Sequence, residues 1–421
     1  MRYRSFTNIS DFSSDLATFV GLIGGSEYRR LLLRLGEGLN HKGYVTPIDD
    51  LRFSLELELL NLELLRRRSA GGILPGYPEH LHEAAQFVMG LAEAIPHLST
   101  AAKKKLRGQI IGGLKTNGLR SLQHEMRIAV ALSRQGCDVR FADLEGLGSF
   151  DFLAQRDADE FEVEGKALPI YSGYPIQPQD ADKLLLELRR RFGGWADRTR
   201  IPIVNITIDG KLPVNRDDHL RLIAACSDAV AKKGDIQVEP RTEVHFVGTI
   251  PDGPAEPLLE AARRDAWSHG IAVYFLPKHP KVIVRLRSVK ESRFARNIVA
   301  AIADASKRQL TGSRPGIIWT HIDYIDKSTF DSLARSTERP CLFDSIANAV
   351  FNSAHRRHVI QIIFSGAPHF LKEGDHGRSV FHTAIYNAPN GKFNIPMLFG
   401  GGRTQRANVP QKPEDDAGAK S

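Results

Sequence analysis

The chain has 421 residues, of which 42% are hydrophobic and 25% charged, a balance typical of soluble globular proteins. This length predicts two or three domains, or one large domain with additions. No apolar run is long enough for a membrane-spanning helix and the N-terminus lacks a signal-peptide pattern, so we expect a cytoplasmic protein without a membrane partner. The three cysteines are scattered and lack metal-ligand spacing, which argues against a disulfide framework or a zinc site.

The net charge of +8 suggests a polyanionic partner, and the basic residues are unevenly distributed. Between Lys281 and Arg314 there are nine Lys and Arg residues against two acids; the nine are Lys281, Arg285, Arg287, Lys290, Arg293, Arg296, Lys307, Arg308 and Arg314. A second cluster runs from Lys103 to Arg120. Solvated helix faces and contacts with nucleic-acid phosphates both explain such clusters when they are taken alone.

Residues 1–116 are expected to form a helical accessory region. A dense Leu/Glu pattern from Ile48 to Arg68 predicts a helix with a basic last turn, which suits the helix dipole. A second helix is predicted over Glu79–Ala94, and a third begins at Pro96 or Ser99. We find no catalytic or ligand-binding motif in the sequence of this region.

Residues 117–212 have the element order α-β-β-β-α-β, which predicts a compact α/β core with a mixed sheet. A helix over Leu119–Gln135 precedes a short strand, Cys137–Ala142, and the segment Ser149–Ala167 is typical of a β-hairpin. An amphipathic helix at 179–192 and a β-branched strand, Ile201–Ile208, complete this order.

Residues 213–400 predict a second α/β region that extends the first sheet or stands beside it. The expected strands are Val238–Gly248, Ile271–Phe275, Lys281–Arg287, Gly316–His321, Val359–Ser365 and Ser379–Tyr386. The expected helices are Glu291–Leu310, Phe330–Ser336 and Cys341–Ser353. Residues 401–421 are polar and rich in Gly and Pro, which predicts a disordered tail.

The predicted hairpin carries the acidic and basic side chains that could take part in chemistry. Side chains alternate between the faces of a strand, so Glu162, Glu164 and Lys166 share one face of its second arm. Pairing of the arms brings Asp151, on the first arm, close to Glu164. We interpret Glu162 as a surface acid, with a further ligand role left open. Cross-strand salt bridges on an exposed polar face are the alternative explanation for the whole set.

Asp151 and Glu164 are hard oxygen ligands of the kind that Mg²⁺ or Mn²⁺ accepts, with waters filling the remaining positions. A bound metal lowers the pKa of a ligated water and polarises phosphoryl oxygens. Lys166, two residues after Glu164, would then approach the attacking water and the charge that develops on the phosphate. This arrangement is suited to the hydrolysis of a phosphodiester bond.

The segment resembles the core of the restriction-endonuclease-like PD-(D/E)XK nuclease superfamily, whose pattern is an acid near the second core strand followed by Asp/Glu-x-Lys on the third. Asp151 matches the first acid, and Glu164-Gly165-Lys166 matches the second motif. Many members carry a glutamate on the first core helix, and Glu125 stands at that position. The resemblance covers about residues 118–210. The proline that often precedes the first acid is replaced by Phe150.

The resemblance implies a metal-dependent nuclease, with DNA as the expected substrate and restriction, repair or element defence as the setting. Within the first basic cluster we expect Arg285, Arg287 and Arg293 to contact nucleic acid. A homodimer stays open, because members of the superfamily often dimerise to cut two strands, although the chain has no dimer signature. The alternative function is a nucleic-acid-binding or scaffold protein that keeps the nuclease fold without turnover.

Overall fold

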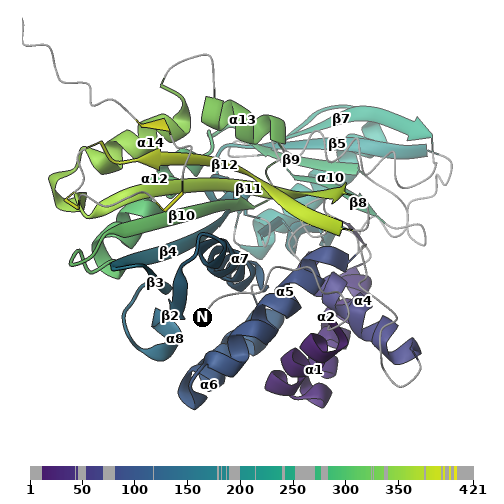
Figure 1. Ribbon diagram of the computed structural model, residues 1–421. Coiled ribbons are helices and arrows are strands. Elements are labelled where there is room, and N and C mark those ends of the chain that lie inside the picture. The colour runs from purple at the N-terminus through teal and green to yellow at the C-terminus, as the bar shows by residue number, and fades with distance from the viewer. Residues whose placement is uncertain are drawn as a thin grey trace, which may run out of the picture.

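The structure is a computed structural model in which two β-sheets and their flanking helices form a mixed α/β protein (Figure 1). It describes residues 12–42, 44–45, 54–69, 81–116, 118–177, 180–181, 183–185, 187–188, 200–213, 215–238, 242–251, 271–275, 283–323, 325, 327–335, 340–373, 376–389, 392–393, 398–399 and 403–404. The predicted disordered tail lies outside these residues, except that Arg403–Thr404 form strand β13.

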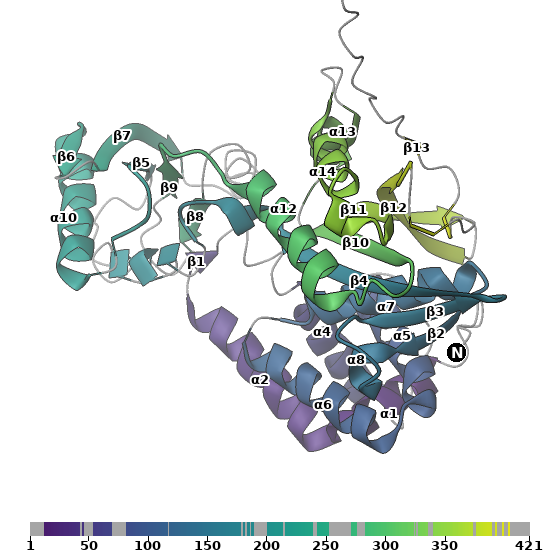
Figure 2. The ribbon, with the colours of Figure 1, turned by 90° about the vertical axis from the view of Figure 1, so that its left-hand side faces the viewer.

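The N-terminal region is helical, as predicted. Its helices are α1 (Phe12–Ile23), α2 (Gly25–Lys42), α4 (Ser54–Arg68), α5 (His82–Ala94), the 3-10 turn η4 (Ile95–His97) and α6 (Thr100–Lys115). The Ser99 side chain caps α6 by accepting a hydrogen bond from the Ala102 N–H at 3.2 Å. Phe19 and Phe87 share one apolar core with residues of the larger sheet, so these helices form a layer beneath it (Figure 2). Among the described segments, no helix is long and apolar enough to cross a membrane.

The larger sheet has seven strands in the order β13-β12-β11-β10-β4-β3-β2. Helix α7 (Arg120–Arg134) leads into β2 (Asp138–Phe141), helix α8 (Ala142–Glu145), β3 (Phe152–Arg156) and β4 (Asp159–Pro169). The predicted hairpin is confirmed, with Phe152 opposite Val163 and Asp157 in the left-handed region at its turn, with φ 56°. The strands β10 (Gly316–Asp323) and β11 (Val359–Glu373) run parallel to β4, and β12 (His376–Asn387) is antiparallel to β11.

The prediction that the strand near 201–208 completes this sheet is wrong. That strand, β5 (Arg200–Ile208), lies in a second sheet of order β1-β8-β9-β5-β7-β6, and β10 takes the place beside β4. The reason is burial: β4 is covered on both faces, and β10 is a strand of eight consecutive buried residues. Burial along β5 instead alternates over most of its length, which suits a sheet with one main apolar face.

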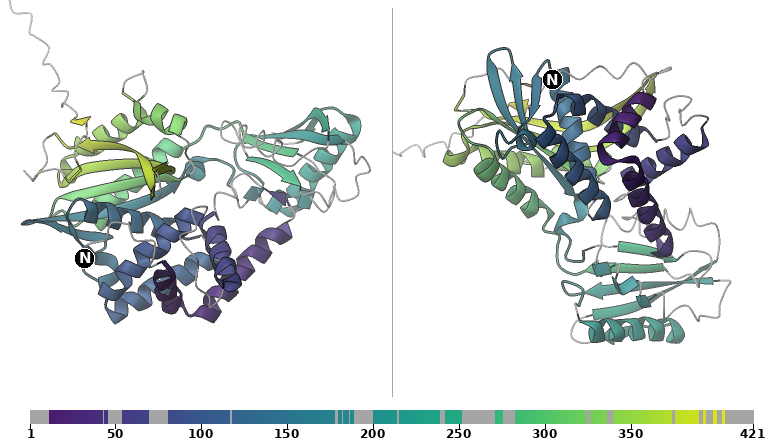
Figure 3. Two further views of the ribbon diagram at one scale, coloured as in Figure 1. Left: turned by 45° about the vertical axis from the view of Figure 1, so that its right-hand side comes forward. Right: turned by 90° about the horizontal axis from the view of Figure 1, so that it is seen from below.

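The second sheet forms a separate lobe, visible in both views of Figure 3. Its other strands are β1 (Tyr44–Val45), β6 (Ile236–Val238), β7 (Thr242–Pro251), β8 (Ile271–Phe275) and β9 (Ile283–Ser288). Helix α10 (Arg216–Lys232) packs on one of its faces through an apolar core of its own. Apart from β1, the strands and helix of this lobe follow the 3-10 turn η5 (Ile170–Gly173) in the chain, so they interrupt the larger sheet between β4 and β10.

A third layer of helices covers the second face of the larger sheet. It consists of α12 (Phe294–Asp304), its π-helical continuation η6 (Ala305–Gln309), α13 (Lys327–Arg335) and α14 (Leu342–Phe351), with the short turn η7 (Ala354–Arg356) before β11. Their apolar side chains form a core with Leu153 and Ile318 of the sheet. The helix beside β10 is therefore α12, whereas the expected helix at 179–192 lies partly outside the described residues.

Candidate active site

Glu164 and Lys166 lie on the face of β4 that α12 covers. The Lys166 Nζ donates a hydrogen bond to Glu164 Oε1 at 2.6 Å. Glu164 is only 1% exposed, and its second carboxylate oxygen, Oε2, is buried without a hydrogen-bond partner in the described part of the chain. A buried carboxylate oxygen without a partner is costly, so this oxygen is available to a ligand.

Asp151 immediately precedes β3 and is held against β4. Its Oδ2 accepts a hydrogen bond from the backbone N–H of Gly165 at 2.7 Å. A Cβ at Gly165 would lie 3.3 Å from this oxygen and 2.7 Å from Ile128 Cδ1 on α7, so a residue without a side chain allows the close approach. The hairpin therefore brings Asp151 together with Glu164 and Lys166, as the sequence predicted.

Glu125 reaches the same cluster from α7, which packs on β4. Burial and the negative charges of Asp151, Asp143 and Glu164 raise its pKa well above the usual value. Asp143 was not predicted from the sequence. It lies on α8, where the Lys105 Nζ approaches its Oδ2 at 3.8 Å. Its only sequence signal was its place just before the hairpin, because α8 is a single turn.

The carboxyl groups of this cluster have raised pKa values, because ionising all of them at one buried place is unfavourable. Burial raises the pKa of Asp151 to about 6, against the opposing effects of the Gly165 N–H and the Lys166 charge. Burial and the charge of Asp151 raise the pKa of Glu164 to about 7, again against Lys166. Without a cation, Glu164 therefore keeps its proton up to about pH 7, whereas Asp151 loses its proton near pH 6. Perturbed acids gathered at one place are typical of functional sites.

The side chains of this cluster suit a hard divalent cation with few protein ligands. Asp151 and Glu164 supply two carboxylates, and the Glu164 Oε2 atom accepts no hydrogen bond within the usual distance from the residues that the structure describes. Mg²⁺ commonly takes one or two carboxylates and keeps several waters. The described residues contain no group of three His, Cys, Asp or Glu side chains that could hold a metal ion. Water or substrate oxygens would have to complete any coordination sphere here.

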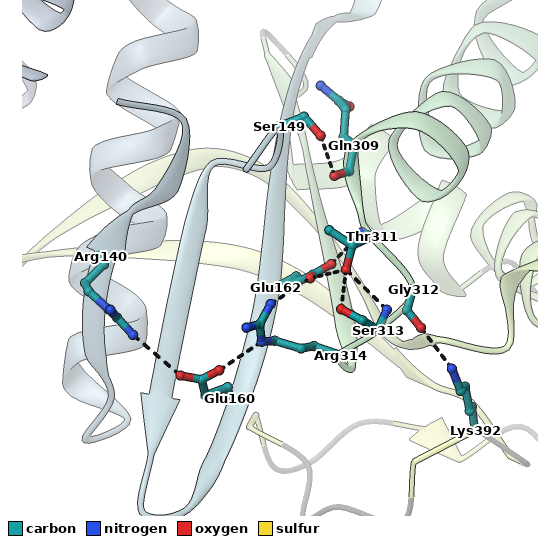
Figure 4. Close-up of polar contacts among 10 residues, drawn as sticks. All are labelled: Arg140, Ser149, Glu160, Glu162, Gln309, Thr311, Gly312, Ser313, Arg314 and Lys392. Carbon is teal, nitrogen blue, oxygen red and sulfur yellow. Dashed lines mark hydrogen bonds and ion pairs between the residues drawn. The ribbon is translucent and has the colours of Figure 1, made fainter. Parts of the chain in front are cut away.

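Glu162 is not a surface acid, and the structure corrects that prediction. Its side chain is fully buried and accepts hydrogen bonds from the Thr311 N–H at 2.7 Å and the Thr311 hydroxyl (Figure 4). Arg314 lies 3.5 Å from it and pairs more closely with Glu160, at 2.8 Å. Glu162 thus fastens the loop before β10 onto β4, which is a structural role.

The three arginines expected to contact nucleic acid do not lie on one element. Arg285 and Arg287 belong to β9 of the second sheet, where Arg287 Nε donates to Thr207 Oγ1 at 2.9 Å. Arg293 is exposed at the start of α12, and its backbone N–H donates to Gly173 O at 2.9 Å. Since η5 directly follows β4, only Arg293 is tied to the strand that carries Glu164 and Lys166.

A buried polar network, absent from the sequence predictions, fixes α7 against β10. His124, next to Glu125, stacks on His321 at 5.0 Å between ring centroids, and its Nε2 lies 3.1 Å from Trp319 O. Burial lowers the pKa of His124 to about 3, so the ring is neutral and donates this bond. His321 continues the network to Ser365 Oγ at 3.0 Å and Asp323 Oδ1 at 3.2 Å. The network holds the helix that presents Glu125.

Comparisons with known proteins give no independent assignment: no family model, curated protein or solved structure matches the chain.

Proposed function

We propose that this protein is a metal-dependent nuclease that hydrolyses phosphodiester bonds in DNA. One observation carries the proposal: Asp151, just before β3, meets Glu164 and Lys166 of β4, and a buried Glu164 oxygen has no hydrogen-bond partner among the described residues. Two acids and a lysine in this arrangement are the residues that the PD-(D/E)XK superfamily uses.

The element order gives further support. With the second sheet set aside as an insertion, and apart from the single-turn helix α8 between β2 and β3, the elements α7, β2, β3, β4, α12 and β10 follow in the order α-β-β-β-α-β. Within that set β2, β3 and β4 are antiparallel neighbours, and β10 joins parallel to β4. This is the core order that the resemblance implies, built from a different helix and fourth strand than the sequence suggested.

The chemistry assigned to each residue follows from its surroundings. Asp151 and Glu164 would hold Mg²⁺ or Mn²⁺, which when bound supplies a Lewis acid and lowers the pKa of a ligated water. Lys166, with its Nζ 2.6 Å from Glu164 Oε1, places a positive charge where negative charge develops on the phosphate. Glu125, half-buried beside Asp151, would accept a proton or orient a water through its raised pKa.

The basic residues suggest a polyanionic substrate and divide into two groups by position. Arg293 stands at the start of α12, next to the turn that follows β4. Arg285 and Arg287 lie on the second lobe, so they would contact a more distant part of a bound duplex. We therefore assign Arg293 to the nucleic acid near the cleavage site.

The second candidate function is nucleic-acid binding without turnover. It is favoured by the finding that the described residues contain no three-ligand metal group. A non-catalytic descendant has no chemical need for the complete set of Asp151, Glu164 and Lys166, and for this reason we place the nuclease first.

The test is a cleavage assay on duplex DNA, single-stranded DNA and RNA with Mg²⁺ or Mn²⁺. Asp151→Asn and Lys166→Met should each lower the rate by at least about 100-fold while the protein stays folded. Asp159→Asn, a partly exposed acid at the turn of the same hairpin, is the matched control and should keep the wild-type rate. Binding of DNA without cleavage under all conditions would support the second candidate, and equal cleavage by wild type and both variants would refute the assigned site.

A further inference from the structure

Thr320 lies beside the candidate catalytic lysine on the neighbouring strand. In the parallel pairing of β10 with β4, Thr320 is in register with Lys166, and Ile318 with Glu164. Register partners on adjacent strands present their side chains to the same face of a sheet, about 5 Å apart. Ile318 belongs to the core on the α12 side, so Glu164, Lys166 and Thr320 share that face.

The Thr320 hydroxyl is buried and unsatisfied. The residue is 0% exposed, and its Oγ1 has no hydrogen-bond partner among the residues that the structure describes. The Glu164 Oε2 atom, two residues before Lys166, is likewise buried without a hydrogen-bond partner among the described residues. Burial of a hydroxyl without a partner costs about 1–3 kcal/mol, and native proteins retain few such groups. Two of them flank one lysine here.

Lys166 has more hydrogen-bond donors than the carboxylate oxygen Glu164 Oε1 takes up. An ammonium group carries three N–H donors, and Glu164 Oε1 accepts one of them at 2.6 Å. The same carboxylate is the group that our proposed function assigns to a divalent cation. When Glu164 is engaged elsewhere, Lys166 needs another acceptor within reach on its own face. The Thr320 Oγ1 lies at the register position beside Lys166 and has no hydrogen-bond partner among the described residues.

We propose that Thr320 is a positioning residue whose hydroxyl accepts a hydrogen bond from the Lys166 ammonium and holds it in place when Glu164 binds a cation. This inference rests on the proposed function for its purpose, but the coupling of Lys166 to Thr320 is a property of the chain itself. Valine has the shape of threonine without its hydroxyl, so Thr320→Val removes the acceptor and leaves the packing intact.

The first test needs no metal and no substrate. Thr320→Val is introduced into wild type and into Glu164→Met, which deprives Lys166 of its carboxylate, and thermal unfolding is followed in EDTA. In wild type the variant should raise Tm by about 2–4 °C, because an unsatisfied hydroxyl is removed. In the Glu164→Met background it should lower Tm, because Thr320 is then the acceptor for Lys166. An equal rise in both backgrounds would overturn the inference.

The second test uses the full-length protein with Mn²⁺ and DNA. Thr320→Val should lower kcat about tenfold, with KM and the calorimetric Mn²⁺ affinity changed less than about twofold. Thr320→Ser, which keeps the hydroxyl, should retain most of the wild-type kcat. Equal kcat values for the valine variant and wild type would refute the positioning role. If wild type itself cuts no nucleic acid, the proposed function fails while the unfolding test still decides whether Thr320 and Lys166 are coupled.

Discussion

The burial of Asp151 leads to a prediction about protein stability that can be tested without substrate or metal. Asp151→Asn should stabilise the metal-free protein at neutral and alkaline pH. Asparagine keeps an oxygen that can accept the hydrogen bond from the Gly165 N–H, and it removes a charge that is unfavourable at this position. A change that abolishes the proposed activity would thus make the fold more stable, as expected where a site is strained for function.

The magnitude follows from the two pKa values of the carboxyl group. In the folded protein the pKa of Asp151 is about 6, against an ordinary value of 3.8. A raised pKa means that the folded state binds the proton more tightly than the unfolded state, so stability is lost as pH rises from about 4 through 6. Above pH 7 the full cost is present, about 3 kcal/mol at roughly 1.4 kcal/mol per pKa unit. At pH 4 it is less than about 1 kcal/mol.

The assay is thermal or urea unfolding of wild type and Asp151→Asn in EDTA, from pH 4 to pH 8. The difference in unfolding free energy should grow with pH to about 3 kcal/mol, which corresponds to a Tm rise on the order of 5 °C. Asp159→Asn, at the turn of the same hairpin, controls for the loss of an acid as such. If Asp151→Asn is no more stable than wild type at pH 8, the desolvated environment that we assign to Asp151 is wrong.

The remaining predictions concern the cation, the nucleic acid and the packing of the site. Mn²⁺ should raise the Tm of wild type but not of Glu164→Gln. The affinity of wild type for Mn²⁺, measured by calorimetry, should increase from pH 5 to pH 8, because Glu164 loses its proton as the pH passes its pKa of about 7. An affinity independent of pH would contradict this. Arg293→Glu should weaken DNA binding and flatten its salt dependence more than Arg287→Glu does, measured by fluorescence anisotropy, and an identical salt slope for both would remove Arg293 from the site. Gly165→Ala should destabilise the fold by about 1–3 kcal/mol in urea unfolding, because its Cβ meets Ile128 Cδ1 at 2.7 Å. Ile128→Val deletes that atom and should restore part of the loss, and no recovery would mean that the clash lies elsewhere.

Local sequence determined the hairpin and therefore the positions of Asp151, Glu164 and Lys166 in the candidate site. Alternation along β3 and β4 fixes which side chains share a face, and the short turn at Asp157 fixes the register that puts Asp151 beside Glu164. The position of Glu125 on α7 followed from helical periodicity in the same way. These features depend on residues close together in the chain, so a pattern within one segment is enough to predict them.

The tertiary structure alone decided which strand lies beside β4. Both β5 and β10 are β-branched apolar strands, and β5 is much nearer in sequence, yet β10 pairs with β4 from about 150 residues away. The choice depends on burial of both faces of β4 between α7 and α12, which no segment encodes by itself. The same pairing buried Glu162 under Thr311 and set Thr320 beside Lys166. The sequence identified the candidate site residues, and long-range packing decided their surroundings, because a side chain's burial depends on every element that covers it.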